Sequence, residues 1–384
     1  MSAALLLAST LALQAPAAAP QETPRPLDLD RGWEISGDVR VEPHLGRPAI
    51  RFRTGRAIRR DVAFENGTID AQMAVSGRRS FGYVQFRIQK DDEYEEFYLR
   101  PHKSELPDAL QYAPVFRGES YWQFFHGPGG TAPVELPRDR WIPVRVVVEG
   151  SRAALFVGDL TTPRLVVPRL ARDTVKGVFA LNGFLPAGAA PEGEYPVSYS
   201  EIVVRPGFVA YDFSKRPPPA AAPPGSISRW SVSPSFEPPP GPLRALPKPA
   251  GEWGRLDADP AGRVLLFRDR ARLKPRQRVA VLSRVTLQAA SDGERRLNVG
   301  FSDEVTVFLD GRPLFSGDAI YRFDNPRQEG LITLSQATVY LPLRKGPNEL
   351  VLAVADVFGG WGFAAQLDGE GVSVAVEGKE PSAR

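Results

Sequence analysis

Polar and aromatic side chains alternate with apolar ones between Tyr83 and His126, and this stretch contains the chain's strongest candidates for chemistry. Its four short pieces are YVQFRIQ, EEFYLRPH, LQYAPVF and YWQFFHG. Successive side chains of a strand point to opposite faces of a sheet, so each piece would have one apolar face and one polar, aromatic face. Sugars need flat apolar surfaces for their C–H groups and amide or guanidinium groups for their hydroxyls. The pattern therefore predicts a face that binds a glycan.

The strand period selects the residues of this face. Val84 and Phe86 would point to the core, and Tyr83, Gln85 and Arg87 would then point away from it. The predicted ligand-binding residues are Tyr83, Gln85, Arg87, Glu96, Tyr98, Arg100, Gln111 and Trp122. The prediction requires Arg87 and Arg100 to emerge on the same side of the sheet, beside the indole ring of Trp122. The alternative is an ordinary solvated face, on which an Arg87–Glu96 cross-strand pair would contribute little.

Short strands joined by turns must position these side chains. The chain has 384 residues, which corresponds to two or three domains. It contains 38 Pro and 35 Gly, and no long apolar run repeats with the helical period. Asn66-Gly67 is a turn signal, and the residues from Trp141 to Val157 resemble a hairpin about Glu149-Gly150-Ser151.

We predict an all-β protein of two β-sandwich (jelly-roll) domains joined by a Pro-rich linker. The first domain would cover residues 30–207, the linker 208–225 and the second domain 226–378. The segment ISRWSVS, which follows the linker, is typical of a strand of the second domain. Further along, EVTVFLDG and ELVLAVADV show the alternation expected of strands with one buried face.

Both predicted domains resemble known families. FENGTID, GYVQFRIQ, YEEFYLRPH, LQYAPVFRG and WIPVRVVVEG resemble a concanavalin A-like, laminin-G-like jelly roll, in particular the bacterial secreted domains grouped as 3-keto-disaccharide hydrolase-like. FLDGRPLFSG, LPLRKGPNELVLAV and GGWGF resemble a galactose-binding-like β-sandwich. The first resemblance implies a fold that hosts lectins, enzymes and adhesion modules. The second implies a supporting or binding role.

Catalysis has weaker candidates, which are Glu96, Arg100 and His102. Glycoside hydrolases usually need two carboxyl groups facing each other across the substrate, and the E-x-D-x-x-E strand motif of the jelly-roll glucanases is absent. The acidic run DDEYEE lies where a hairpin turn is expected, so most of it would be solvated. A 3-keto-glycoside hydrolase or lyase needs only a base and a cation, and Glu96 or His102 with Arg100 could supply them. The sequence leaves three functions open: glycan binding, glycoside cleavage and a structural envelope spacer.

We expect no cofactor and no metal site. The three histidines, His44, His102 and His126, are far apart in the sequence, and cysteine is absent. No phosphate-binding loop, Ser-His-Asp arrangement or dinucleotide-binding fingerprint occurs. A structural calcium ion at Asp324 and Glu329 remains an alternative, although no ligand spacing specifies it.

Charge and the N-terminus restrict the partners and the location. The 48 Lys and Arg residues nearly balance the 45 Asp and Glu residues, and no basic run stands out, so we expect no nucleic-acid partner. Residues 1–19 contain an apolar stretch followed by small residues, which is typical of a signal peptide. We expect a secreted or periplasmic protein, bacterial by its composition, with no transmembrane segment and a glycan or oligosaccharide as its partner.

Overall fold

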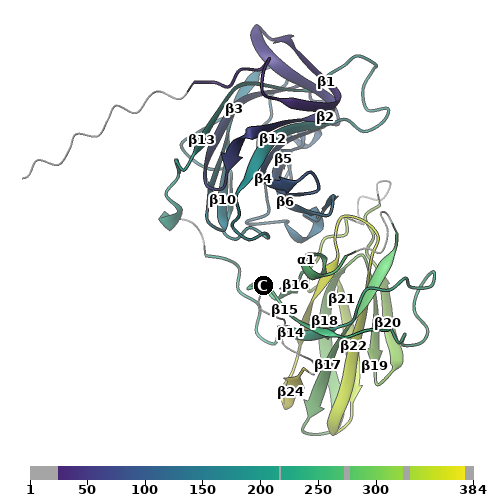
Figure 1. Ribbon diagram of the computed structural model, residues 1–384. Coiled ribbons are helices and arrows are strands. Elements are labelled where there is room, and N and C mark those ends of the chain that lie inside the picture. Colours follow the sequence, from purple (N-terminus) through teal and green to yellow (C-terminus); the bar gives the residue numbers. More distant parts are fainter. Residues whose placement is uncertain (1–24, 216–217, 272–276, 323–328, 377–384) are drawn as a thin grey trace, which may run out of the picture.

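The computed structural model describes residues 25–215, 218–271, 277–322 and 329–376. Strands are the dominant regular structure of these residues and helices are few and short, which confirms the all-β class (Figure 1). The predicted signal peptide lies outside the described residues. Among those described, no helix is both long and apolar enough to cross a membrane.

One continuous sheet builds the first domain. Its strands are β1 (Glu34–His44), β2 (Arg47–Phe64), β3 (Gly67–Val75), β4 (Phe81–Lys90), β5 (Glu93–Leu99), β6 (Leu110–Phe116), β7 (Glu119–Ser120), β8 (Thr131–Ala132), β9 (Trp141–Glu149), β10 (Arg152–Val157), β11 (Leu165–Val167), β12 (Gly177–Phe184) and β13 (Val197–Pro206). The strand order is β11-β10-β9-β3-β13-β2-β12-β4-β5-β6-β7, with β1 paired to β2 and β8 to β6.

The long strand β2 joins the two layers of this sandwich. Residues 50–52 pair with β13 in one layer, and residues 55–64 pair with β12 in the other. Phe52, Phe86, Phe97 and Tyr199 are buried between the layers. The alternation predicted for β4 and β5 therefore exists, with Val84, Phe86 and Phe97 in the core.

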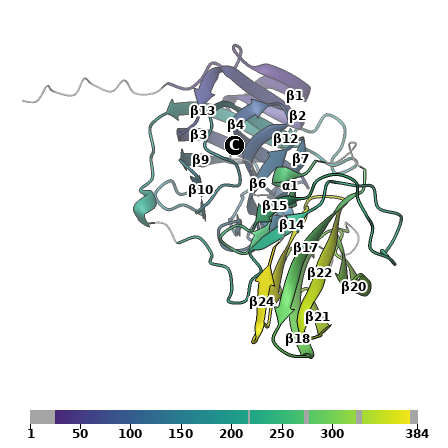
Figure 2. The same ribbon diagram turned by 60° about the horizontal axis from the view of Figure 1, so that its bottom comes forward.

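The second domain contains two packed sheets. Its elements are β14 (Arg229–Val232), β15 (Gly254–Asp257), β16 (Arg263–Val264), α1 (Leu266–Asp269), β17 (Val279–Ala289), β18 (Gly293–Ser302), β19 (Glu304–Leu309), β20 (Arg312–Asp318), β21 (Ala337–Leu343), β22 (Gly346–Asp356), β23 (Gly362–Leu367) and β24 (Val372–Ala375). One sheet has the order β15-β14-β17-β22-β19-β20, with β24 beside β17 (Figure 2). The other sheet has the order β16-β23-β18-β21. The predicted segment ISRWSVS contains β14, and its Trp230 is fully buried.

Three short 3-10 helices complete the described elements: η1 (Pro101–Lys103), η2 (Trp122–Phe124) and η3 (Phe213–Lys215). The segment YWQFFHG was expected to be a strand, and this was wrong, because it leaves the sheet after β7 and forms η2. Its aromatic residues Tyr121, Phe124 and Phe125 are buried.

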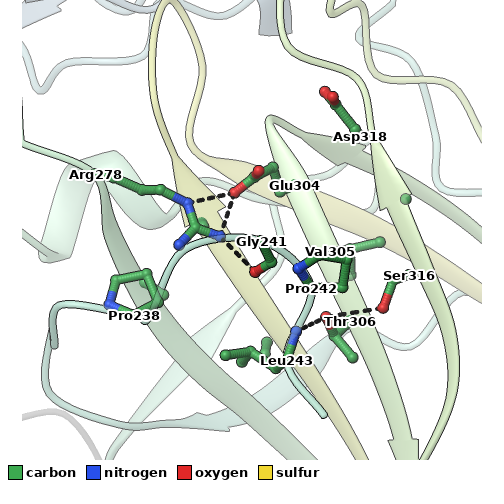
Figure 3. A pocket seen from close by; sticks show the side chains of 14 residues that line it. Pro238, Gly241, Pro242, Leu243, Arg278, Glu304, Val305, Thr306, Ser316 and Asp318 are labelled. Atoms are coloured by element: carbon green, nitrogen blue, oxygen red, sulfur yellow. Dashed lines mark hydrogen bonds and ion pairs between the residues drawn. The ribbon is translucent and has the colours of Figure 1, made fainter.

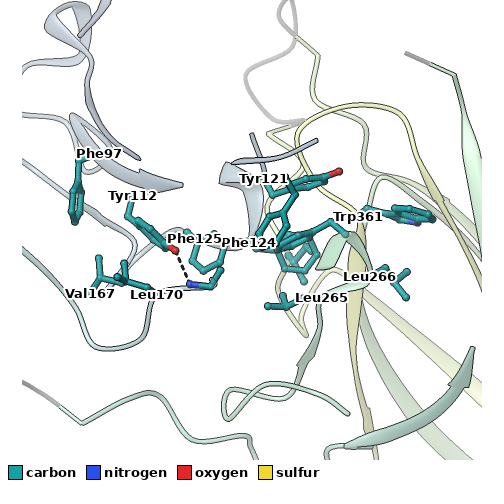
Figure 4. Close-up of a cluster of buried hydrophobic side chains, with 14 of the residues drawn as sticks. Phe97, Tyr112, Tyr121, Phe124, Phe125, Val167, Leu170, Leu265, Leu266 and Trp361 are labelled. Carbon is teal, nitrogen blue, oxygen red and sulfur yellow. Dashed lines mark hydrogen bonds between the residues drawn. The ribbon is translucent and has the colours of Figure 1, made fainter. Parts of the chain in front are cut away.

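This segment packs the first domain onto the second. The Tyr121 ring stacks on Phe267 of α1, with 4.1 Å between the ring centroids, and Phe124 packs edge-on against Phe267 at 5.4 Å. Leu265, Leu266 and Trp361 belong to the same buried cluster, which is continuous across the junction (Figure 4). The two domains therefore share one apolar core, in addition to the segment of chain that connects them.

The described residues of the connecting segment also lie against both domains. The hydroxyl of Thr68 donates to the carbonyl of Phe208 over 2.6 Å, and Phe213 is buried beside Val147 and Phe156. Further along, the amide of Ala222 donates to the carbonyl of Pro260 over 2.7 Å.

Candidate functional site

A groove of about 480 Å³ lies on the face of β4 and β5 that is turned away from the core, here called the outer face. Strand register builds its floor, because Asn182 of β12 pairs with Tyr83 of β4, and Gln85 pairs with Glu96 of β5. The lining residues are Ser36, Gly37, Thr54, Gly55, Arg56, Tyr83, Gln85, Tyr94, Glu96, Ser120, Asn182, Gly183 and Phe184. They include three of the predicted ligand-binding residues: Tyr83, Gln85 and Glu96.

A buried amide and a buried carboxyl form the centre of the groove floor. Gln85 Nε2 donates to Glu96 Oε2 over 3.0 Å, and Ser120 Oγ donates to Glu96 Oε1 over 3.2 Å. Burial raises the pKa of Glu96 from 4.5 to about 7, although the hydrogen bonds from Gln85 and Ser120 oppose this. Near neutral pH the Glu96 carboxyl therefore exchanges between a form that donates a hydrogen bond and a form that only accepts.

Arg56 and Tyr94 supply a cationic and aromatic wall. The Arg56 guanidinium lies over the Tyr94 ring, 4.8 Å from its centroid, and Nη1 donates to the carbonyl of Asp91 over 3.0 Å. Among the described residues, the buried Arg56 Nε and Nη2 have no hydrogen-bond partner, whereas the Gln85 side chain interacts with both Glu96 and the Tyr94 hydroxyl. Arg56 thus brings unused donor capacity to the groove, which buried polar groups rarely have.

Aromatic rings form one rim of the groove. Phe184 is 42% exposed, and its ring centroid lies 5.9 Å from that of Phe81. The Phe81 ring stacks on Tyr83, with 6.3 Å between the centroids. The rim and floor together match what a sugar ring needs, a flat apolar face beside amide, guanidinium and carboxyl groups.

Three other predicted residues, Tyr98, Arg100 and Gln111, are buried beside the groove and bind one another. Arg100 Nη2 donates to the Tyr98 hydroxyl over 2.9 Å and to Gln111 Oε1, and Arg100 Nη1 donates to the carbonyl of Asp108 over 2.6 Å. Gln111 Nε2 donates to the carbonyls of Trp122 and Phe125 over 2.7 and 2.8 Å. This network fastens η2 to the sheet, so these side chains position Trp122.

Arg87 is not on the outer face, and the expectation that it would emerge beside Arg100 was wrong. Its φ is +53°, and the register between β4 and β5 shifts between Phe86 and Lys90, which marks a β-bulge. Arg87 is fully buried and donates to the carbonyls of Glu65 and Gly150 over 2.7 and 2.6 Å. The bulge ends the two-residue period, so the side chain reaches turns of the opposite layer.

Trp122 lies at the junction of the domains. Its half-buried indole is edge-on to Tyr321 of the second domain, with centroids 5.4 Å apart, and the Arg100 guanidinium lies 6.0 Å from its ring. It is not among the residues that line the groove.

The candidates for catalysis separate in the structure. Glu96 lines the groove, whereas Arg100 belongs to the network described above. His102 lies edge-on to Phe81 at 5.3 Å, and burial together with nearby cations, Arg79 first, lowers its pKa to about 4. Glu96 is the one carboxyl among the groove's lining residues.

The acidic run is less solvated than the sequence suggested. Asp91 and Asp92 are exposed, but Glu95 is as buried as Glu96 and points to the core side. The Tyr112 hydroxyl donates to Glu95 over 2.6 Å, and burial raises the pKa of Glu95 to about 7. Sequence reasoning also missed Arg56 and Asn182, because register alone brings them to this groove.

A second cavity, of about 280 Å³, lies in the second domain (Figure 3). Its polar groups already have partners. Arg278 pairs with Glu304 and donates to the carbonyls of Pro239 and Gly241, and Leu243 N donates to the hydroxyl of Thr306. These bonds hold the segment around residues 238–243 on the sheet, so we assign the cavity a structural role.

No cluster of three or more His, Cys, Asp or Glu side chains that could hold a metal ion occurs in the described part of the chain. Of the two residues considered for calcium, Asp324 lies outside the described residues. The calcium alternative therefore stays untested.

Part of this chain resembles solved carbohydrate-binding and galectin-like structures. A carbohydrate-binding module (CBM66) from Bacillus subtilis matches with 13% identity over 46% of this chain and 92% of the module, at a TM-score of 0.32. A protein of unknown function with a galectin-like fold, also from B. subtilis, matches with 10% identity over 45% and 88%, at 0.33. The Caenorhabditis elegans galectin LEC-6 matches with 11% identity over 44% and 96%, at 0.28.

A protein described as a putative glycosyl hydrolase, from Parabacteroides distasonis, matches with 12% identity over 45% of this chain and 88% of that protein, at a TM-score of 0.31. No family model and no curated protein matches the sequence.

Proposed function

We propose that this protein binds a carbohydrate in the groove of its first domain and that it does so as an exported protein. The observation that carries the proposal is the Gln85–Glu96–Ser120 floor beside the exposed Phe184 ring and the half-buried Tyr83 ring. Each sugar hydroxyl both donates and accepts hydrogen bonds. An amide beside a half-protonated carboxyl can accept from such a hydroxyl or donate to it. The Phe184 and Tyr83 rings would pack against the C–H groups of the sugar.

The number of carboxyl groups that line the groove favours binding without cleavage. Hydrolysis of a glycosidic bond by two carboxyl groups needs them about 5–5.5 Å or about 6.5–9.5 Å apart across the substrate. Glu96 is the one acid that lines the groove, and Glu95 is on the opposite face of the same strand. A neutral or weakly charged oligosaccharide is the ligand that this groove would accept.

One observation supports a second candidate, a glycoside-cleaving enzyme. A carboxyl with a pKa of about 7 is suited to proton transfer at neutral pH, and Glu96 has this value and lines the groove. Such an enzyme would act on a substrate in which a neighbouring ketone already makes a C–H proton acidic, for example a 3-keto-disaccharide. Incubation with oxidised disaccharides distinguishes the candidates. Turnover that Glu96→Gln abolishes would favour the enzyme, and intact binding without turnover would favour the binding protein.

Two phenylalanines of nearly equal exposure, one on the groove and one in the connecting segment, make a matched test of binding. Phe184 on the groove rim is 42% exposed, and Phe208, away from the groove, is 43% exposed. We expect Phe184→Ala and Gln85→Ala to weaken retention on polysaccharide gels severalfold, and Phe208→Ala to leave it unchanged. Equal retention by all three folded variants, or no retention of any polysaccharide by the wild type, would refute the proposal.

A further inference from the structure

Trp122, Tyr321 and Phe358 form an aromatic cluster where the two domains meet. Trp122 is edge-on to Tyr321, with centroids 5.4 Å apart, and Tyr321 lies 6.1 Å from Phe358. Phe358 is 49% exposed, and the other two rings are half-buried. An exposed aromatic ring beside two half-buried ones forms an apolar surface patch, and such patches often mark sites that bind a ligand or a partner.

The backbone of this cluster is held rigidly from inside the second domain. The buried Asp303 accepts hydrogen bonds from the amides of Val357 and Phe358 over 2.6 and 2.5 Å. A side chain added at Gly359 would come within 2.9 Å of the Trp122 indole nitrogen, so the loop packs directly on this ring. Phe358 is therefore displayed by a fixed backbone.

The junction fixes the position of the cluster relative to the groove. The side chain of the fully buried Gln123 accepts a hydrogen bond from Ser302 Oγ over 2.6 Å. The backbone amide of Gln123 donates to the carbonyl of Gly359 over 3.3 Å. Arg263 donates to the carbonyl of Phe124, and Arg117 to the carbonyl of Phe267. Together with the shared apolar core, these bonds make the cluster a preorganised extension of the first domain.

A chain of aromatic and guanidinium contacts runs from the groove to the aromatic cluster. Tyr83 of the groove lies 5.2 Å from Tyr98, and the Arg100 guanidinium lies over both Tyr98 at 4.7 Å and Trp122 at 6.0 Å. The groove and the cluster are therefore connected through two neighbouring side chains, Tyr98 and Arg100, which are themselves buried.

We propose that Trp122, Tyr321 and Phe358 are a second part of the glycan site, contributed jointly by both domains. This inference rests on the proposed function of the groove and specifies its ligand class. The ligand is a polysaccharide chain that occupies the groove and continues over the junction, and a single sugar or a disaccharide would be too short to contact both.

The length of the oligosaccharide is the variable that tests this proposal. We would measure Kd by titration calorimetry with β-linked gluco-, manno- and xylo-oligosaccharides from disaccharide to hexasaccharide. Phe358→Ala and Tyr321→Ala should each weaken hexasaccharide binding roughly threefold to tenfold, the range of one stacking contact, and leave disaccharide binding unchanged. Tyr340→Ala is the control, because Tyr340 is 58% exposed on β21 of the same domain.

The outcomes separate this inference from the proposed function. If the wild type binds the hexasaccharide and both variants bind it equally well, the second subsite is refuted and the groove stands. A loss of the same size for the disaccharide would also refute it, because the substitution would then be acting on the groove through the junction. If the wild type binds no probe of any length, both proposals fail.

Discussion

Glu96→Gln should change how the stability of the protein depends on pH. The folded protein holds the Glu96 proton up to a pKa of about 7, and the unfolded chain releases it near 4.5. Between these values the folded state binds more protons, so the free energy of unfolding falls as pH rises through this window. One pKa unit corresponds to about 1.4 kcal/mol, so the Glu96 contribution lost between pH 4.5 and pH 8 is about 3 kcal/mol at most.

Glutamine keeps the size of the side chain and removes its titration. Urea denaturation of the wild type and Glu96→Gln, followed across this pH range, gives the comparison directly. The wild type should lose more stability than the variant, by about 3 kcal/mol at most. Glu95 will produce a similar loss in both proteins, because burial also raises its pKa to about 7.

Glu105→Gln serves as the control, because the carboxyl of Glu105 is exposed. It should follow the wild type at every pH. If Glu96→Gln also lost stability in parallel with the wild type, Glu96 would be ionised in the folded groove well below pH 7. The inferred exchange between donor and acceptor roles at the groove floor would then be wrong.

Two further substitutions test the architecture that positions the site. Arg87→Met would remove the buried guanidinium that donates to the part-buried carbonyls of Glu65 and Gly150, so we expect a loss of about 3 kcal/mol in urea denaturation; a loss under about 1 kcal/mol would show that these carbonyls find other partners. Phe267→Ala should cost about 3–5 kcal/mol, because the ring is fully buried at the junction. It should also split thermal unfolding into two transitions by calorimetry, whereas one unchanged transition would mean that the domains do not depend on this contact.

Local alternation predicted much of the first domain's sheet. Val84 and Phe86 lie in the core, and Gln85 and Tyr83 line the groove, as the period of two requires. Arg87 departs from this period because of a bulge at a residue with positive φ, and the sequence carries no glycine or asparagine there to signal it.

The junction was beyond what local patterns reveal. Tyr121, Phe124 and Phe125 do not alternate with polar residues, because all three are buried in the core that the two domains share. The absence of alternation between apolar and polar residues in this segment was the signal in the sequence against a strand. Arg56 and Asn182 reach the groove through strand pairing over long sequence separations, which only the register reveals.

A crystal structure of the protein with the longest oligosaccharide that it retains would test the central claim most directly. We predict a sugar ring in the groove, with a hydroxyl within hydrogen-bond distance of Gln85 or Glu96 and a face against Tyr83 or Phe184. A sugar bound elsewhere on the molecule, with none in this groove, would contradict the account.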